Sequence, residues 1–284
     1  MKKKIYPVLA IFILFALSEV QGAEVEKKEV ITKTLKFSNP RGSKELEVDN
    51  MNGSINVVGQ NRDDVEIVVH KTIVAESEEK INEADSVEVL DITEKNNFIS
   101  LYVDAPYRKH DGSVNYRGWK HYRYKVSFSY QISVPFETDL VLKTINDGDI
   151  VVTGVRGNFE VNNINGAVTM KAISGSGKAY SLNKDTRIEF EKNPSEGCYF
   201  GSLNGDVIVA FRSGLSADFK IKTFNGDAFT DFSMTYLPLA TSVQQKENGK
   251  FVYKAERATS LRTGNGGPLI ELDGFNGDIQ ILER

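Results

Sequence analysis

The sequence predicts an all-β protein: a repeat-built β-solenoid or β-roll with stacked strand–Asn-Gly turn–strand rungs and a strand-rich insertion. Three observations predict this. A short phrase of five residues (large apolar, Asn, Gly, small or acidic, apolar) occurs six times in the chain. Apolar residues alternate with other residues on both sides of each turn, as in strands with one buried face. The copies also recur at nearly constant spacing through the middle of the chain.

The copies are centred on one Asn each. They lie at 51–55, 145–150, 164–168, 203–207, 224–228 and 275–279, and the second copy has one extra residue in its turn. A degenerate copy at 181–184 has its Asn at 183. Asn positions 146, 165, 183, 204 and 225 are then separated by steps of 19, 18, 21 and 21 residues. A period of roughly 20 residues or more is typical of stacked repeats, in which no unit buries its apolar face alone.

The residues around each turn follow a fixed pattern. Positions six and four before the Asn are mostly large and apolar, and the position two before it is always small or polar. The residue directly before the Asn is large and apolar but has the opposite parity, so we expect a bend that re-aims the side chains there. We expect Asn-Gly to form the turn because both residues tolerate positive φ.

Stacking of these units makes two local predictions. Leu142, Val161, Phe200 and Ile221 should stack in successive rungs about 4.8 Å apart within one continuous core, with Val161 and Phe200 on either side of the degenerate copy. The recurrent asparagines, Asn165, Asn204 and Asn225 among them, should lie in one row with their amides bonded from rung to rung.

The repeated phrase resembles the putative-adhesin family of exported bacterial proteins, a domain of unknown function built from β-strand repeats. The resemblance lies in the phrase apolar-x-small-apolar-Asn-Gly-x-apolar-x-apolar and in the lead-in Ile132-Ser133-Val134-Pro135, and it spans residues 40–284. It implies a β-repeat fold and an adhesin-like role, and it specifies no ligand.

Residues 1–22 have the features of a signal peptide. Lys2–Lys4 form a basic start, Val8–Leu17 an apolar stretch that is short for a membrane span, and Val20-Gln21-Gly22 a cleavage site with small residues. We expect an exported protein that is periplasmic, on the cell surface or extracellular, with no transmembrane segment after cleavage. An uncleaved membrane anchor is the alternative.

We expect residues 23–284 to form a single β-repeat domain. Its expected parts are a first repeat (46–58), a strand-rich insertion (60–135), a repeat run (136–232), an insertion or cap (233–269) and a last repeat (270–284). Within the 60–135 insertion, Glu78–Ser86 is the expected helical turn, and strict alternation from Tyr122 to Val134 predicts one long antiparallel strand.

Charge and motifs argue against several function classes. Without residues 1–22 the chain keeps 32 basic and 38 acidic residues of the original 35 and 39, which does not favour nucleic-acid binding. Cys198 is the only cysteine and occupies an apolar repeat position, so we expect a core thiol. The three histidines lack metal-ligand spacing. Asp149, Asp206, Asp227 and Asp278 follow the turn glycines and should face solvent, with a calcium site as the alternative. We therefore expect no catalytic, cofactor-binding or metal-binding residues and no enzyme.

One segment interleaves aromatic and cationic residues and is the candidate ligand patch. Its residues are Tyr107, Arg108, Tyr116, Arg117, Trp119, Lys120, Tyr122 and Arg123. Such side chains bind sugars by stacking or anionic polymers through their cations. The alternative is an ordinary solvated loop whose Trp119 covers the end of the solenoid.

The function that these features favour is a non-catalytic exported β-repeat protein that binds or scaffolds at the cell envelope or surface. Its expected partner is an envelope glycan or another envelope protein. An envelope-stress or regulatory accessory module is an alternative, because relatives of the family resemble sensory accessory proteins. A polysaccharide-active β-helix enzyme is a third possibility.

Overall fold

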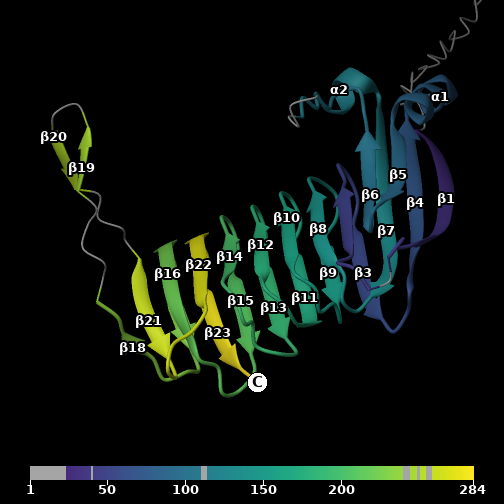
Figure 1. Cartoon of the computed structure of the whole chain (residues 1–284). Coiled ribbons are helices and arrows are strands. Elements are labelled where there is room, and N and C mark those ends of the chain that lie inside the picture. The colour runs from purple at the N-terminus through teal and green to yellow at the C-terminus, as the bar shows by residue number, and fades with distance from the viewer. Residues whose placement is uncertain (1–23, 40, 110–113, 239–243, 248–249, 254–257) are drawn as a thin grey trace, which may run out of the picture.

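The computed structural model describes residues 24–284 except 40, 110–113, 239–243, 248–249 and 254–257, and side chains are described outside 239–257 (Figure 1). The predicted signal peptide and its cleavage site therefore lie outside the described residues. The described chain consists of two large mixed β-sheets with little helix, which confirms the predicted all-β class. No helix in these described ranges is long and apolar enough to cross a membrane.

Sheet A has the strand order β1-β4-β7-β3-β9-β11-β13-β15-β23-β17 across the described residues. Its strands are β1 (Val25–Lys36), β3 (Ile55–Gln60), β4 (Asp64–Ala75), β7 (Tyr124–Pro135), β9 (Ile150–Thr153), β11 (Val168–Ile173), β13 (Thr186–Phe190), β15 (Val207–Phe211), β17 (Ala228–Thr230) and β23 (Ile279–Glu283).

Sheet B has the order β18-β21-β16-β22-β14-β12-β10-β8-β2-β6-β5 across the same residues. Its strands are β2 (Glu45–Asp49), β5 (Val89–Lys95), β6 (Phe98–Asp104), β8 (Asp139–Thr144), β10 (Phe159–Asn163), β12 (Gly177–Ser181), β14 (Cys198–Ser202), β16 (Ala217–Asn225), β18 (Thr235–Tyr236), β21 (Thr259–Thr263) and β22 (Leu269–Asn276). Strands β19 (Gln244–Glu247) and β20 (Lys250–Tyr253) pair with each other.

Helices α1 (Glu78–Val87) and α2 (Trp119–Tyr122) belong to the 60–135 segment. The α1 helix confirms the helical turn predicted at 78–86. Its N-cap is Ser77, whose side chain accepts a hydrogen bond from the Lys80 backbone N–H, and Ile81 and Ala84 bury its inner face. The long strand predicted from Tyr122 is β7, which begins only at Tyr124 because Tyr122 ends α2 and Arg123 has a left-handed conformation. Strand β7 pairs antiparallel with β4, as predicted, and parallel with β3.

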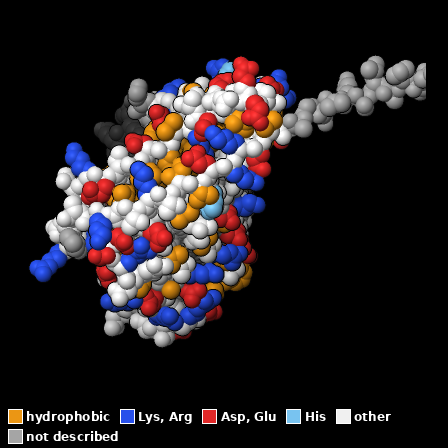
Figure 2. All heavy atoms as spheres, turned by 90° about the vertical axis from the view of Figure 1, so that its right-hand side faces the viewer, with side chains coloured by type: hydrophobic (Ala, Val, Ile, Leu, Met, Phe, Trp, Pro, Cys, Tyr) orange, Lys and Arg blue, Asp and Glu red, His pale blue; other side chains and the backbone are white. Residues whose placement is uncertain are grey.

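One edge strand of sheet A is β1, and most of its side chains are exposed. In Figure 2, which views the molecule from this side, acidic and basic side chains are intermixed over the surface. Charged residues on an edge strand disfavour edge-to-edge pairing with another chain.

In the repeat run, consecutive strands alternate between the two sheets, and each pairs in parallel with the strand two positions further along. Thus β8, β10, β12 and β14 are neighbours in sheet B, while β9, β11, β13 and β15 are neighbours in sheet A (Figure 1). Apolar side chains from the inner faces of both sheets form one continuous core.

The predicted core row is confirmed, with one difference in order. Leu142 pairs with Val161, and Phe200 and Ile221 are buried in the same row. However, Leu272 of the last repeat lies between Phe200 and Ile221, because β22 is inserted between β14 and β16. The edge of β16 is instead covered by the antiparallel β21, so the parallel strands of sheet B end against an antiparallel strand.

The turn asparagines form the predicted ladder. From Asn146 onward, each side-chain amide nitrogen donates to the amide oxygen of the Asn before it in the row. The row is Asn52, Asn146, Asn165, Asn183, Asn204, Asn276 and Asn225, with bonds of 3.2, 2.6, 2.7, 2.9, 2.8 and 2.8 Å. At its start, the Asn52 amide donates to the Val126 carbonyl oxygen at 2.9 Å. The degenerate copy at Asn183 takes its place in the row without interruption.

A second set of polar side chains supports the turns from inside. These are residues two positions before the ladder Asn, and each donates to a backbone carbonyl oxygen of its own or the preceding turn. They include Asn50, Thr144, Asn163, Ser181, Ser202 and Thr223. Buried carbonyls need such partners, so these positions are polar as well as small.

Two of the turn acids, Asp149 and Asp227, are exposed as expected, and Asp206 and Asp278 are half-buried. The backbone also bonds to several of these carboxylates. The carboxylates of Asp149, Asp206 and Asp278 each accept a backbone N–H from the adjacent unit, at 2.8, 2.9 and 3.0 Å. Across the described residues, no group of three or more His, Cys, Asp or Glu could hold a metal ion.

The reason for glycine in the turns differs from the predicted one. Of the Asn-Gly glycines, Gly53 and Gly277 have positive φ, at 115° and 154°, and none of the ladder asparagines does. At Gly166 a Cβ atom would collide with the Gly148 carbonyl oxygen of the adjacent unit. Close stacking of neighbouring turns, rather than backbone conformation alone, therefore requires glycine.

We predict that Asn204→Ala lowers the free energy of unfolding by about 1–2 kcal/mol, because Asn204 both donates and accepts a ladder bond. Asn162→Ala is the matched control, since Asn162 lies outside the ladder and makes only a 3.4 Å contact with Glu160. Urea denaturation measures both. Equal stability losses in the two variants would reject the energetic role of the ladder.

We predict that Gly166→Ala destabilises the fold by at least about 2 kcal/mol, because the added methyl meets rigid backbone that cannot move aside. Gly197→Ala is the control: its nearest neighbour would be the Leu269 carbonyl oxygen at 3.3 Å, and its φ is not in the positive region. Thermal melting of the two variants measures the difference. A Gly166→Ala protein as stable as Gly197→Ala contradicts the stacking argument.

Candidate functional site

The large apolar residue before each ladder Asn stays on the outer face of sheet B, so the expected re-aiming of this side chain is wrong. Strands β16 and β22 continue through the Asn, which leaves Phe224 and Phe275 facing outward. The residues form a row, since the backbone N–H groups of Asn165, Asn183, Asn204 and Asn276 donate to the backbone carbonyl oxygens of Ile145, Ile164, Leu182 and Leu203, and the Phe224 ring stacks on Phe275. We call this row the apolar ridge: Met51, Ile145, Ile164, Leu182, Leu203, Phe275 and Phe224.

The first part of the ridge is covered by the aromatic residues of the predicted patch. Met51 forms a small second core with Ala105 and Tyr107, against which Ile145, Val114, Tyr116 and Tyr122 pack. The ring centroids of Tyr107, Tyr116 and Tyr122 lie 5.0–5.6 Å apart, with Tyr116 and Tyr122 stacked in parallel. The structure thus brings these three predicted residues together, but it packs them against the protein itself.

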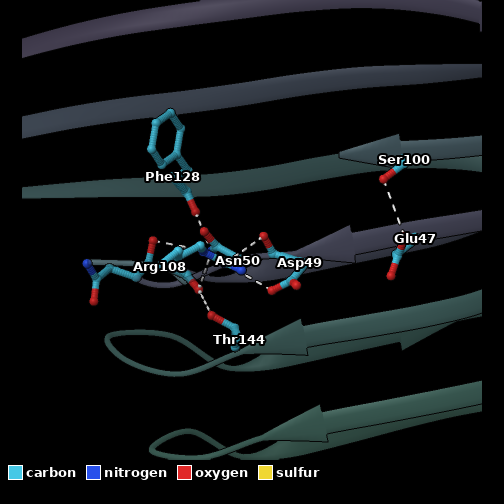
Figure 3. Close-up of polar contacts among 9 residues, drawn as sticks. Glu47, Asp49, Asn50, Ser100, Arg108, Phe128 and Thr144 are labelled. Carbon is cyan, nitrogen blue, oxygen red and sulfur yellow. Dashed lines mark hydrogen bonds and ion pairs between the residues drawn. The ribbon is translucent and has the colours of Figure 1, made fainter. Parts of the chain in front are cut away.

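Arg108 fastens the same segment to the outer face of sheet B. Its guanidinium lies 2.9 Å from the Asp49 carboxylate and 4.6 Å from the centroid of the Tyr102 ring. Figure 3 shows Arg108 pointing toward Asp49, beside Asn50, whose amide donates to the Phe128 carbonyl oxygen. An Arg that is paired and stacked in this way is held in place and contributes to structure.

The remaining patch residues do not converge on one site. Arg117, Lys120 and Arg123 are exposed, and Arg123 lies 3.5 Å from Glu76. Trp119 is half-buried at the start of α2 and belongs to neither core cluster. The tyrosines, rather than Trp119, therefore cover the end of the ridge.

A buried polar group lies beneath the tyrosines. The Tyr107 hydroxyl donates to the Glu88 carboxylate at 2.7 Å, and the Lys71 ammonium donates to Asp85 and to the Glu88 backbone carbonyl. Burial raises the pKa of Glu88 to about 7, although the Tyr107 hydrogen bond and the Lys71 charge oppose the rise. Burial likewise raises the pKa of the Tyr107 hydroxyl, so this group stays a hydrogen-bond donor.

The later part of the ridge is open to solvent. Ile164 and Phe224 are 39% and 59% exposed, and the rings of Phe224 and Phe275 stack with centroids 4.8 Å apart. Beside the ridge, two further rows of side chains cross the outer face of sheet B. One row contains Tyr180, Gly201, Asp273 and Lys222, and the other contains Lys178, Tyr199, Glu271 and Lys220.

A cavity of about 220 Å³ opens on these rows. Its lining includes Tyr199, Lys220, Lys222, Glu271 and Asp273. The sequence pattern marked each turn but gave no sign of this hollow, because it arises from side chains on strands that are distant in sequence. Cys198 is buried in the core, as predicted, and burial raises the pKa of its thiol.

No family model matches the chain, and no curated protein matches it. Among solved structures, it is similar to a putative cell adhesion protein from Clostridium sporogenes, with 12% identity, a TM-score of 0.42, and coverage of 91% of this chain and 100% of that one. It is also similar to a putative adhesin from Bacteroides fragilis, with 12% identity, a TM-score of 0.37, and coverage of 90% and 97%. A putative lipid binding protein from Parabacteroides distasonis has 12% identity, a TM-score of 0.28, and coverage of 89% and 96%. These likenesses are too distant to assign a function.

We predict that the protein loses stability as pH rises through 7, with Glu88 as the cause. The unfolded Glu88 ionises near 4.5, whereas the folded one keeps its proton to about 7. The contribution of Glu88 to the free energy of unfolding is therefore complete below pH 4.5. It declines by about 3 kcal/mol as the pH rises to 7. Glu88→Gln, whose amide oxygen still accepts from Tyr107, should flatten this dependence between pH 5 and 8.

Denaturant unfolding at a series of pH values tests this, with Glu160→Gln as the control because Glu160 is exposed on β10. The control should keep the wild-type slope. A Glu88→Gln variant with that same slope would show that the titration belongs to another group.

Proposed function

We propose that this is a non-catalytic, exported β-repeat protein that binds or scaffolds at the cell envelope or surface in the manner of an adhesin. We further infer that its repeat region is a β-solenoid, in which each strand–turn–strand unit is one rung. The observation that carries the binding function is the exposed part of the apolar ridge, from Ile164 to Phe224.

The solenoid interpretation is supported by register. Leu140, Phe159 and Gly177 are paired in parallel from strand to strand in sheet B, and Ile150, Val168 and Thr186 are paired likewise in sheet A. The unbroken amide ladder supports the same interpretation, because it needs every turn to repeat the position of the one before it.

The binding role is supported by the exposure of large apolar side chains in a line. Single exposed apolar residues are common on protein surfaces, but a contiguous row of them is typical of an interaction site. The chain covers the row where it begins, at Met51 and Ile145. Beyond them Ile164, Phe275 and Phe224 are exposed, with Leu182 and Leu203 half-buried between them. The open part is one side chain wide, which suits an extended polymer lying across the rungs better than a broad protein interface.

The envelope location is supported by the amino-terminal sequence. Residues 1–22 have the basic, apolar and small-residue segments of a signal peptide, and the repeated phrase resembles a family of exported proteins. Without the signal peptide the chain is mildly acidic, which suits a partner recognised through apolar contacts rather than through strong charge.

The test is co-sedimentation of the purified protein with isolated envelopes of the organism that encodes it. The double variant Ile164→Ser/Phe224→Ser removes two exposed ridge side chains and should weaken binding about tenfold. The matched control is Phe229→Ser/Val89→Ser, which removes side chains that are 53% and 48% exposed but lie away from the ridge.

Both double variants should keep the wild-type melting temperature, since all four residues are exposed. Wild-type protein that stays in the supernatant rejects the envelope-binding function. Equal losses of binding in the two double variants would reject the ridge as the binding surface.

A further inference from the structure

The first strand of sheet A presents a long unpaired edge. All twelve residues of β1 pair one for one with β4 on one side. Within the described residues β1 has no second neighbour, because it ends the strand order of sheet A. The other strands that end the two large sheets are shorter, with seven residues in β5, three in β17 and two in β18. Among these ends, β1 therefore offers the longest row of backbone N–H and C=O groups to another strand.

Strand β1 lacks most of the devices that protect a sheet edge. Its sequence contains no proline, and its pairing with β4 runs from Val25 to Lys36 without a shift, so no bulge interrupts the strand. Charge is the remaining protection, because like charges opposite one another disfavour pairing. The charged residues are Glu26, Lys27, Lys28, Glu29, Lys33 and Lys36.

These charges are complementary to a second copy of β1 in one antiparallel register. In that register Ile31 lies opposite Ile31 of the second copy. Glu26 then lies opposite Lys36, and the symmetry of the pair repeats this contact. Glu29 lies opposite Lys33, again twice. Two contacts that each form twice give four pairs of opposite charge, and no residue of β1 faces a like charge.

The neighbouring registers bring lysines together instead. A shift of the second copy by one residue puts Lys28 opposite Lys33 in one direction and Lys27 opposite Lys36 in the other. A shift by two residues puts Lys27 opposite Lys33, or Lys28 opposite Lys36. None of these four registers contains a pair of opposite charges. The charges of β1 therefore disfavour slipped pairings and favour the register centred on Ile31.

Apolar side chains at this end of the core are incompletely covered. Ile31 and Leu35 pack against the core but are only partly buried, and Val30 on the other face is 59% exposed. Figure 2, which faces this end of the molecule, shows apolar side chains among the charged ones. Residues opposite each other in an antiparallel pair point to the same face, so Ile31 of a second copy would lie against Ile31 on the inner side. The second copy would thus extend sheet A and its core together.

We propose that β1 is a homodimer interface, in which two copies of the chain pair antiparallel about Ile31 and join their A sheets into one. Strand addition of this kind gains affinity from backbone hydrogen bonds, while the four charge pairs select the partner and the register. The partner is a second copy of this chain, because the charge pattern of β1 is complementary to itself.

The dimer goes beyond the proposed function and does not depend on it. Figure 1 places β1 at the opposite end of the molecule from β16 and β22, which hold Phe224 and Phe275 of the apolar ridge. Pairing through β1 therefore leaves the exposed part of the ridge free in both copies. Two ridges on one particle can engage one surface together, which raises avidity without any new contact to the ligand.

Sedimentation velocity of the purified protein over a range of concentrations tests the proposal. The wild type should show a monomer–dimer equilibrium. Lys33→Glu places an anion opposite Glu29 at both symmetry-related contacts and should raise the dimer dissociation constant about tenfold or more. Glu29→Lys places a cation opposite Lys33 and should act in the same way. Lys171→Glu is the matched control, since Lys171 is exposed on β11 within the same sheet, and it should dimerise as the wild type does.

A mixture of the two edge variants separates pairing from damage to the fold. When Lys33→Glu and Glu29→Lys are combined in equal amounts, every contact between unlike copies again joins opposite charges. The mixture should therefore form a dimer about as strong as that of the wild type, although each variant alone does not. Damage to either fold would not be repaired by adding the other variant.

Three results would overturn the proposal. The first is a wild type that stays monomeric up to about 1 mM, because weaker pairing has no specific role. The second is a Lys33→Glu variant that dimerises as strongly as Lys171→Glu. The third is a mixture of Lys33→Glu and Glu29→Lys that dimerises no better than either variant alone.

Discussion

The side-chain amide ladder is the interaction on which the other features depend. Each ladder Asn before the last one, Asn225, is both donor and acceptor, so an inner unit that shifted by one residue would break two bonds and leave polar groups unpaired. The ladder thereby fixes the register of both sheets. Fixed register puts Leu142 and its counterparts into the core, and it puts the residues before each Asn, such as Ile164, in a line on the outside.

Local sequence determined much of the fold in advance. Alternation identified the buried row, and the spacing of Asn183 revealed a unit that lacks its glycine. The insertion of β22 beside β14 could not be predicted, because strands of equal pattern are equally good partners and only the chain path decides between them. The opposite parity of the residue before each Asn predicted a bend that re-aims the side chains, whereas strands β16 and β22 continue through the Asn and leave this residue on the outer face.

The candidate site likewise has features that local sequence could predict and features that it could not. Aromatic and cationic composition singled out Tyr107, Tyr116 and Arg108 as a candidate ligand patch, but composition does not distinguish rings that face solvent from rings that pack together. The cavity beside Tyr199, Lys222 and Asp273 is lined by residues of strands β14, β16 and β22, so no local motif marks it. Long-range register, rather than residue type, creates it.

The position of the last repeat has a consequence for the order in which the chain can fold. Asn276 bonds to Asn204, 72 residues earlier, and Asn225 bonds to Asn276, 51 residues later. During synthesis from the amino terminus, β16 and β17 emerge before β22 and β23, the parallel strands beside which they finally lie. Closing such long loops is slow, and unpaired strands are prone to aggregate in the meantime. Strands β16 and β17 therefore lack their parallel partners until β22 and β23 have been synthesised. In that interval their unpaired edges need protection by a chaperone.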